Sequence, residues 1–262
     1  MGSATREALA AGRAALGAAA RDGLAVGTAL FQVADVVGGS AQLRSALADP
    51  SADPKAKQAL VSAVFKDSGP AARVLDMLTT SRWSTPDDLV AGMDELGIRA
   101  IAASAPRGVS ITDELFAFAT AVQSDAQLEL ALGSKLGADD AKHSLISSLL
   151  GEKSSAQTRA IVQHVVTHPR GRRIGQVLSR TAAIVADQAG QKVATVVTAK
   201  PLKAAQLTRL RAGLSATYGA DLKLNQVIDP SIIGGVRVQV GDDVIDGSVS
   251  TRLTELRLAL VG

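Results

Sequence analysis

Two stretches of the sequence, residues 30–65 and 115–150, match each other without a gap at a constant separation of 85 residues. The matching landmarks are Leu30-Phe31, Ala41-Gln42-Leu43 and Ala56-Lys57 in the first stretch, and Leu115-Phe116, Ala126-Gln127-Leu128 and Ala141-Lys142 in the second. Chance explains scattered Ala and Leu matches in a chain of this composition, but not three such landmarks in one register. An internal repeat of this kind indicates that one small group of helices is built twice.

Each copy predicts the same succession of helices. In the first copy we expect a helix that ends near Gly38-Gly39, followed by helices over residues 43–47, 55–65, 71–80 and 89–103. In the second copy the corresponding helix ends near Ser124, and helices follow over residues 128–132, 141–150, 156–167 and 174–189. Asp53-Pro54 and Thr85-Pro86 each place a capping side chain before a proline at the first helical position, which is typical of a helix start.

The Ala-rich segment over residues 4–20 predicts one further helix before the first copy, because it contains no proline and no β-branched run. Leu9 and Leu16, with the alanines between them, form an apolar stripe on this helix. A stripe made mostly of alanine is shallow, so it suits the close approach of another helix.

The period of the sequence changes from residue 191 onward. Val193, Val196 and Val197 predict a strand, and Leu207, Leu210 and Leu214 share one face of a predicted helix over residues 203–218, with Gly219 as its C-cap. Alternating apolar residues then predict three short strands: Leu222, Leu224 and Val227 in the first, Val236, Val238 and Val240 in the second, and Val244-Ile245 in the third. Val249, Leu253, Leu256 and Leu260 indicate a terminal helix.

The sequence therefore predicts a mainly α protein in three parts. Residues 1–108 form a first helical module that includes the N-terminal helix, and residues 109–190 form a second helical module that repeats it. Residues 191–262 form a small α/β domain with the order β-α-β-β-β-α. The boundaries are placed at breaks rich in Gly and Pro, such as Ala105-Pro106-Arg107-Gly108.

Composition excludes several classes of function. The chain contains no Cys, so it has no disulfide, no thiolate nucleophile and no Cys-based metal site. Aromatic residues are only 2% of the chain, which counts against a platform that stacks single-stranded nucleic acid, and the net charge of +3 is too small to predict a polyanion partner. No apolar run reaches about 18 residues, and the N-terminal residues lack the apolar core of a secretory signal.

Two motifs suggest ligand chemistry but fail in detail. Gly151-Glu152-Lys153-Ser154 lacks the Gly directly before Lys that a phosphate-binding loop requires, so we expect a turn between helices. His164 and His168 are four residues apart on one helix face, but a zinc protease would carry Glu where this chain has Val165. We expect a histidine pair at a helix end, and we predict no metal site, no cofactor site and no catalytic residue.

Two charged groups leave alternatives open. Arg170, Arg172 and Arg173 form a short basic loop that either binds phosphate, a lipid head group or an acidic partner, or is solvated. Asp242, Asp243 and Asp246 lie in and after a hairpin turn, where turn chemistry explains them better than catalysis. Gly234-Gly235 is expected to serve the backbone, as a bulge or a turn with positive φ.

The last part of the chain resembles a known family. Its motifs are Asp229-Pro230, Ile233-Gly234-Gly235-Val236, Val240-Gly241-Asp242 and Ile245-Asp246-Gly247-Ser248, followed by an Arg/Leu-rich predicted helix. Their order and spacing resemble the signature of the δ subunit of bacterial F-type ATP synthase, whose mitochondrial relative is the oligomycin-sensitivity-conferral protein. The resemblance is strong after residue 191, and the helical remainder is compatible with it.

The resemblance implies a non-catalytic stator subunit of the peripheral stalk, which resists rotor torque during proton-driven ATP synthesis. Its implied partners are the N-terminal segments of the α subunits in the catalytic head F1 and the C-terminal region of the b stalk subunit. It also implies one copy per complex, on the cytoplasmic face of the bacterial plasma membrane, held there only through the complex. This chain departs from the usual family member by its second copy of the helical module.

The resemblance also suggests where partners dock. We expect the α-subunit face to include the first helix through Ala8, Leu9 and Leu16, and the b-stalk face to include the terminal helix through Leu253, Leu256 and Leu260. Both sets are equally explained as core residues. The alternative function is a helical protein- or RNA-binding adaptor unrelated to ATP synthase, using Arg170–Arg173; we expect no nucleic-acid partner.

Overall fold

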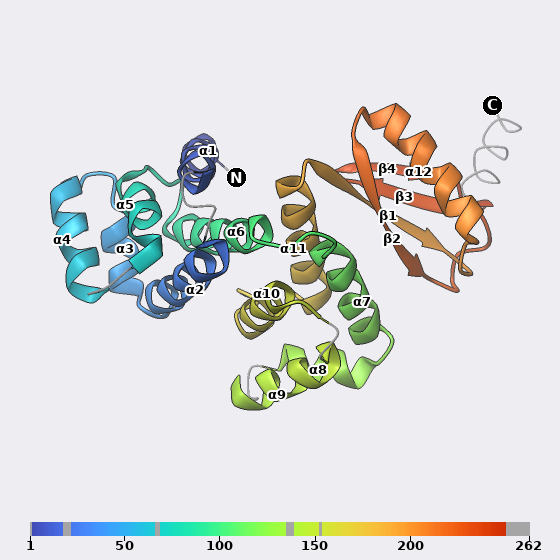
Figure 1. Cartoon of the computed structure of the whole chain (residues 1–262), viewed down its shortest axis with the longest axis horizontal. Coiled ribbons are helices and arrows are strands. Elements are labelled where there is room, and N and C mark those ends of the chain that lie inside the picture. The colour runs from blue at the N-terminus through green and yellow to red at the C-terminus, as the bar shows by residue number, and fades with distance from the viewer. Residues whose placement is uncertain (1, 18–21, 66–68, 135–138, 152–153, 250–262) are drawn as a thin grey trace, which may run out of the picture. The chain divides into compact units, whose positions relative to one another are not determined.

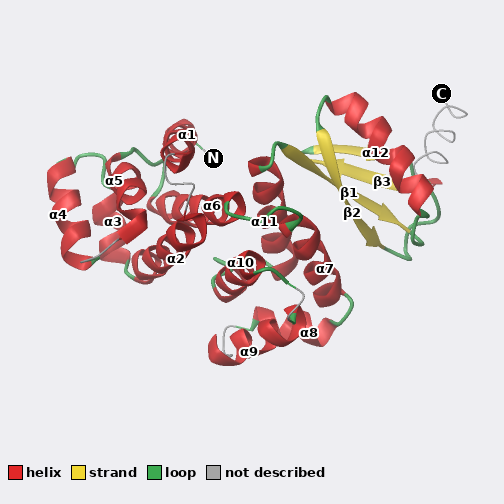
Figure 2. Cartoon of the chain, in the orientation of Figure 1, coloured by secondary structure: helices red, strands yellow, loops and turns green. Residues whose placement is uncertain are grey.

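The computed structural model describes residues 2–17, 22–65, 69–134, 139–151 and 154–249. The chain divides into two compact units, residues 1–185 and residues 186–262 (Figure 1). The described part of the first unit is helical, and the second unit contains a small sheet and one long helix (Figure 2). The predicted fold class, mainly α with a small C-terminal α/β part, is confirmed.

The helices before the sheet form two groups. The first group comprises α1 (Ser3–Gly17), α2 (Gly23–Gly39), α3 (Ala41–Ala48), α4 (Pro54–Val64), α5 (Ala72–Thr80) and α6 (Pro86–Ala103), with a short 3₁₀ turn at Gly69–Ala71. The second group comprises α7 (Ile111–Gln123), α8 (Ala126–Gly133), α9 (Asp139–Leu150), α10 (Ala156–Thr167) and α11 (Ile174–Gln188). Helices α3 and α8 start 85 residues apart, and so do α4 and α9. The division into modules at residues 108 and 190 stays a prediction.

The helix starts follow the capping signals in the sequence. The Asp53 side chain accepts a hydrogen bond from the Lys55 backbone N–H, and Pro54 is the first residue of α4. Thr85 caps α6 in the same way, and Pro86 follows it. These side chains satisfy N–H groups that have no partner inside the helix, so each start is fixed by local chemistry.

The first group packs around α2 and α6. Gly27 of α2 lies against the Gly97 carbonyl of α6, where an added Cβ on Gly27 would come within 2.5 Å of that oxygen. Glycine is therefore needed for the two backbones to approach so closely. Around this crossing lies a hydrophobic cluster whose fully buried members include Leu30, Leu75 and Met93.

A second hydrophobic cluster occupies the second group. Leu115, Leu132, Ile146 and Ile161 are among its most deeply buried members. The buried members that the first group contributes to this cluster are Phe31 from α2, and Ile98 and Ile101 from α6. Helices α2 and α6 therefore contribute buried side chains to both clusters, and the two groups are in contact along these helices.

The second unit is a four-stranded mixed sheet in the order β2-β1-β3-β4. Its elements are β1 (Gln191–Thr198), α12 (Ala204–Tyr218), β2 (Asp221–Ile228), β3 (Val236–Val240) and β4 (Asp243–Asp246). Strand β1 pairs in parallel with β2, while the pairs β1–β3 and β3–β4 are antiparallel. Helix α12 packs through Leu210 and Leu214 on a face that buries Ala194, Val196, Val238 and Val240 (Figure 2). The predicted terminal helix lies outside the described residues.

Among the described helices, no single one combines the length and the hydropathy needed to cross a membrane. Only α2 and α3 taken together meet that criterion, and they are bent by 109° at their junction.

Candidate functional site

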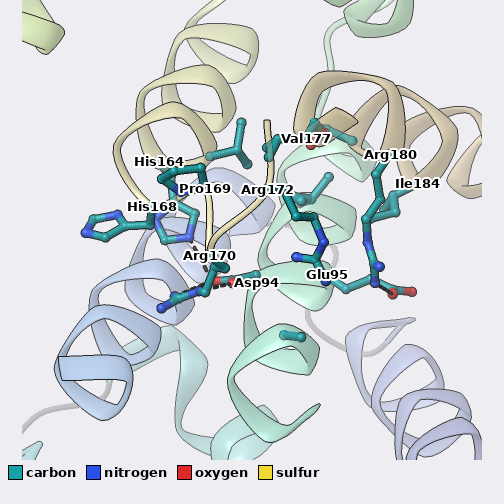
Figure 3. A pocket seen from close by; sticks show the side chains of 14 residues that line it. Asp94, Glu95, His164, His168, Pro169, Arg170, Arg172, Val177, Arg180 and Ile184 are labelled. Carbon is teal, nitrogen blue, oxygen red and sulfur yellow. Dashed lines mark hydrogen bonds and ion pairs between the residues drawn. The ribbon is translucent and has the colours of Figure 1, made fainter. Parts of the chain in front are cut away.

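A cluster of charged and imidazole side chains lies where the two helix groups meet. Asp35 comes from α2 and Asp94 from α6, while His164 and His168 come from the C-terminal end of α10. Arg170 follows in the loop before α11 and points toward Asp94 (Figure 3). Residues far apart in the sequence thus converge on one polar joint inside the first unit.

His164 occupies the centre of this joint. Its Nε2 lies 2.8 Å from Asp94 Oδ1, and its Nδ1 lies 3.6 Å from Asp35 Oδ1. The imidazole also stacks on the Phe31 ring, with centroids 3.8 Å apart and planes 4° from parallel. Burial opposes the charged form, but the nearby carboxylates of Asp94 and Asp35 outweigh burial and raise the pKa of His164.

Arg170 clamps Asp94 from the other side. Its Nε donates to Asp94 Oδ2 at 2.8 Å, and its Nη2 donates to Asp94 Oδ1 at 3.1 Å and to the Ala34 carbonyl at 3.4 Å. Burial alone would raise the pKa of Asp94, but hydrogen bonds from His164 and Arg170 reverse this and lower it. Arg170 adopts φ 50°, a left-handed conformation that is strained for a residue with a Cβ.

His168 and Asp35 face each other without a completed hydrogen bond. Asp35 Oδ1 and His168 Nδ1 are 3.2 Å apart, yet both atoms are buried and neither makes a hydrogen bond within the described residues. Burial lowers the pKa of His168, and Asp35 only partly opposes that effect. The imidazole of His168 is therefore favoured in its neutral form.

A second ion-pair cluster lies beside the polar joint, and residues of both line a cavity of about 50 Å³. Glu95 of α6 is buried and contacts Arg99 Nη2 at 3.0 Å, Arg13 Nη2 at 2.7 Å and Arg180 Nη2 at 3.9 Å. Arg13 belongs to α1 and Arg180 to α11, so this carboxylate joins helices from both groups (Figure 3). The two clusters together place buried charged and imidazole side chains in the contact between the groups.

The predicted docking residues have different locations. Ala8 and Leu9 of α1 are each 4% exposed and belong to the first hydrophobic cluster, and Leu16 packs partly buried against it. Leu253, Leu256 and Leu260 lie outside the described residues.

The predicted basic loop divides into two kinds of arginine. Arg170 is held by Asp94, whereas Arg172 and Arg173 are exposed. The structure thus brings Arg170 into the joint with both histidines. The joint does not include Arg172 or Arg173.

The acidic residues of the hairpin serve separate partners. Asp243 accepts from the Tyr218 hydroxyl, Asp246 pairs with Arg237 at 3.1 Å, and Asp242 is exposed. Gly234 and Gly235 have φ angles of 70° and 83°, so both adopt the positive φ that the sequence predicted for a turn or bulge. The remaining histidine, His143, forms a hydrogen bond between its Nε2 and Thr167 Oγ1 at 3.2 Å.

Sequence patterns did not single out Asp35 and Asp94, the two carboxylates that complete the joint. A usable signal was present, because Asp35 interrupts the otherwise apolar C-terminal half of α2. An isolated acid on a buried helix face requires a cationic or hydrogen-bonding partner from another element.

Comparisons with known proteins identify the family. The model of the family "ATP synthase delta (OSCP) subunit" matches residues 100–260. The ATP synthase subunit delta of Leifsonia xyli subsp. xyli is 56% identical to this chain over 264 residues, and the alignment covers all of both chains. The ATP synthase subunit delta of Streptomyces griseus subsp. griseus is 36% identical over 271 residues, and that alignment also covers all of both chains. A chain in the cryo-EM structure of the Toxoplasma gondii mitochondrial ATP synthase hexamer aligns with a TM-score of 0.41 at 22% identity, covering 64% of this chain and 96% of that one. The chain therefore belongs to the ATP synthase delta (OSCP) subunit family, the non-catalytic peripheral-stalk components of F-type ATP synthase.

Proposed function

We propose that this subunit connects the catalytic head to the peripheral stalk by holding the N-terminal segments of the α subunits at its helical unit and the C-terminal region of the b subunit at its α/β unit. The observation that supports a two-ended connector most directly is the division into two compact units, each with its own buried hydrophobic residues. Two contacts acting together resist rotor torque better than either alone, because linked contacts add avidity. Membership in the family excludes the alternative of an adaptor unrelated to ATP synthase.

The α-subunit face is proposed to include α1. Because Ala8 and Leu9 are buried beneath this helix, they would act by fixing its position. Leu16, at the end of the helix, is only partly buried. The exposed surface of α1 carries Ala10 and Ala14, so a partner helix can approach its backbone closely. The family match begins at residue 100 and spans the second helix group, which makes the second group the competing location for this contact.

The b-stalk face is proposed to include Leu253, Leu256 and Leu260, which share one face of the predicted terminal helix. Each complex is proposed to contain one copy of the subunit, at the cytoplasmic face of the bacterial plasma membrane. The subunit would be attached to the membrane only through the other subunits of the complex. No cofactor is required for this role, since the proposed work is mechanical.

Site-specific cross-linking in the assembled complex tests these contacts. The chain contains no Cys, so single cysteines can be introduced without background, and the unaltered chain serves as the control. Suitable positions are Ala10 on α1, Leu130 on α8, which is 76% exposed, and Val249 at the end of the described chain. We expect A10C to cross-link to an α subunit and V249C to cross-link to b.

The three variants give distinguishable results. Cross-linking of L130C to an α subunit, with none from A10C, would move the head contact to the second helix group. If no variant cross-links to either subunit while the complex remains assembled, the proposed connection is wrong.

A further inference from the structure

We propose that Asp35, His164 and His168 form a binding site for one zinc ion, which ties α2 of the first helix group to the end of α10 in the second. Asp35 Oδ1, His164 Nδ1 and His168 Nδ1 converge from two helices that are far apart in the sequence. This inference goes beyond the proposed stalk function and revises the expectation of no metal site.

The spacing of the three ligand atoms suits zinc. A tetrahedral zinc ion with nitrogen and oxygen ligands at about 2.0–2.1 Å places those ligands about 3.3 Å from one another. Asp35 Oδ1 lies 3.2 Å from His168 Nδ1 and 3.6 Å from His164 Nδ1. All three ligand atoms lie within 4.8 Å of one another, so the ion fits after small side-chain movements. Water would complete the fourth position.

The outer contacts orient His164 as a metal ligand. Its Nε2 donates to Asp94 Oδ1 at 2.8 Å, so Nδ1, which faces Asp35, is the nitrogen that binds the ion after releasing its proton. Arg170 holds Asp94 with two hydrogen bonds, and the stacked Phe31 ring fixes the imidazole plane. A histidine ligand whose second nitrogen donates to a carboxylate is the usual arrangement in zinc proteins.

Two further observations favour an ion at this position. Asp35 Oδ1 and His168 Nδ1 are buried and make no hydrogen bond within the described chain, although buried polar atoms normally do. Two carboxylates face a single guanidinium here, and Arg170 engages Asp94 closely while its Nη2 remains 3.8 Å from Asp35 Oδ1. Arg170 thus only weakly offsets the negative charge of Asp35. The side chains of Asp35 and His168 are each 34% exposed, so an ion can enter from solvent.

Metal titration of the full-length chain tests the site. After treatment with EDTA and its removal, the protein is titrated with Zn²⁺ by calorimetry and with Co²⁺ by visible absorption. We expect one ion per chain, and the intense visible bands of tetrahedral Co²⁺. His168→Gln and Asp35→Asn each remove one ligand and should weaken binding at least about tenfold. His143→Gln is the matched control, because His143 bonds Thr167 instead.

The outcome separates a built site from adventitious binding. The site is supported if H168Q and D35N lose zinc affinity and the cobalt bands while H143Q keeps both. It is overturned if the unaltered chain binds no zinc, or if the two ligand variants bind as tightly as H143Q. Circular dichroism on each variant verifies folding.

Discussion

Arg170→Ala is expected to destabilise the helical unit by about 2–3 kcal/mol. Exposed ion pairs contribute about 0–1 kcal/mol, whereas removing one partner of a buried pair costs about 3–5 kcal/mol. The Arg170 and Asp94 side chains are 25% and 17% exposed, so their pair falls between these limits. The substitution also removes the hydrogen bond to the Ala34 carbonyl and leaves Asp94 with His164 as its remaining partner.

Urea unfolding in the presence of EDTA measures this loss without interference from metal ions. The fluorescence of Trp83 reports on the helical unit, because it is the single tryptophan of the chain and lies buried in the first hydrophobic cluster. Arg170→Gly removes the same ion pair but relieves the positive φ, so it should recover about 1 kcal/mol relative to Arg170→Ala. A double-mutant cycle with Asp94→Asn isolates the coupling between the two side chains.

Arg172→Ala is the matched control for this experiment. Arg172 lies two residues further along the same loop, and its side chain is exposed. Its removal should change the free energy of unfolding by no more than about 0.5 kcal/mol. If R170A costs no more than R172A, Arg170 does not join the two helix groups and the reasoning fails.

Three further predictions concern packing, capping and pH. Gly27→Ala should cost about 1–3 kcal/mol in urea unfolding because its Cβ would meet α6, whereas Gly39→Ala, with open space around it, should be nearly neutral. Thr85→Ala should cost about 1 kcal/mol in the same assay, since it removes the cap of α6; no loss would mean that the cap is dispensable. A hydrogen bond from Arg211 is the main cause that holds the pKa of Asp221 below its usual value of 3.8. The α/β unit should therefore lose stability as the pH falls below 3.8 and through the lower pKa of the folded state. An NMR titration that finds no depression of this pKa would contradict the prediction.

Local signals in the sequence were sufficient for most of the fold. Asp53-Pro54 and Thr85-Pro86 located the starts of α4 and α6 because capping depends only on neighbouring residues. Alternating valines located β1 and β3, and Gly219 ended α12 with φ 60° as expected. These features could be predicted because each is decided within a few residues.

The polar joint could not be predicted in the same way. The spacing of His164 and His168 was visible, but nothing local relates them to Asp35 or Asp94, which arrive from α2 and α6 through tertiary packing. The expectation of no metal site rests on Val165, which stands where a zinc protease has Glu, and takes no account of Asp35. Ala8 and Leu9 show the converse difficulty, because an apolar stripe looks the same whether it meets its own core or another protein.

The contact between Glu95 and Arg180 has a consequence for self-association. These two residues are 85 positions apart, which is the separation of the internal repeat, yet they carry opposite charges and lie 3.9 Å from each other. Two identical copies of either segment would bring Glu against Glu or Arg against Arg at this place, and the repulsion would oppose their pairing. The charge difference thus favours pairing of the first segment with the second over pairing of two like segments.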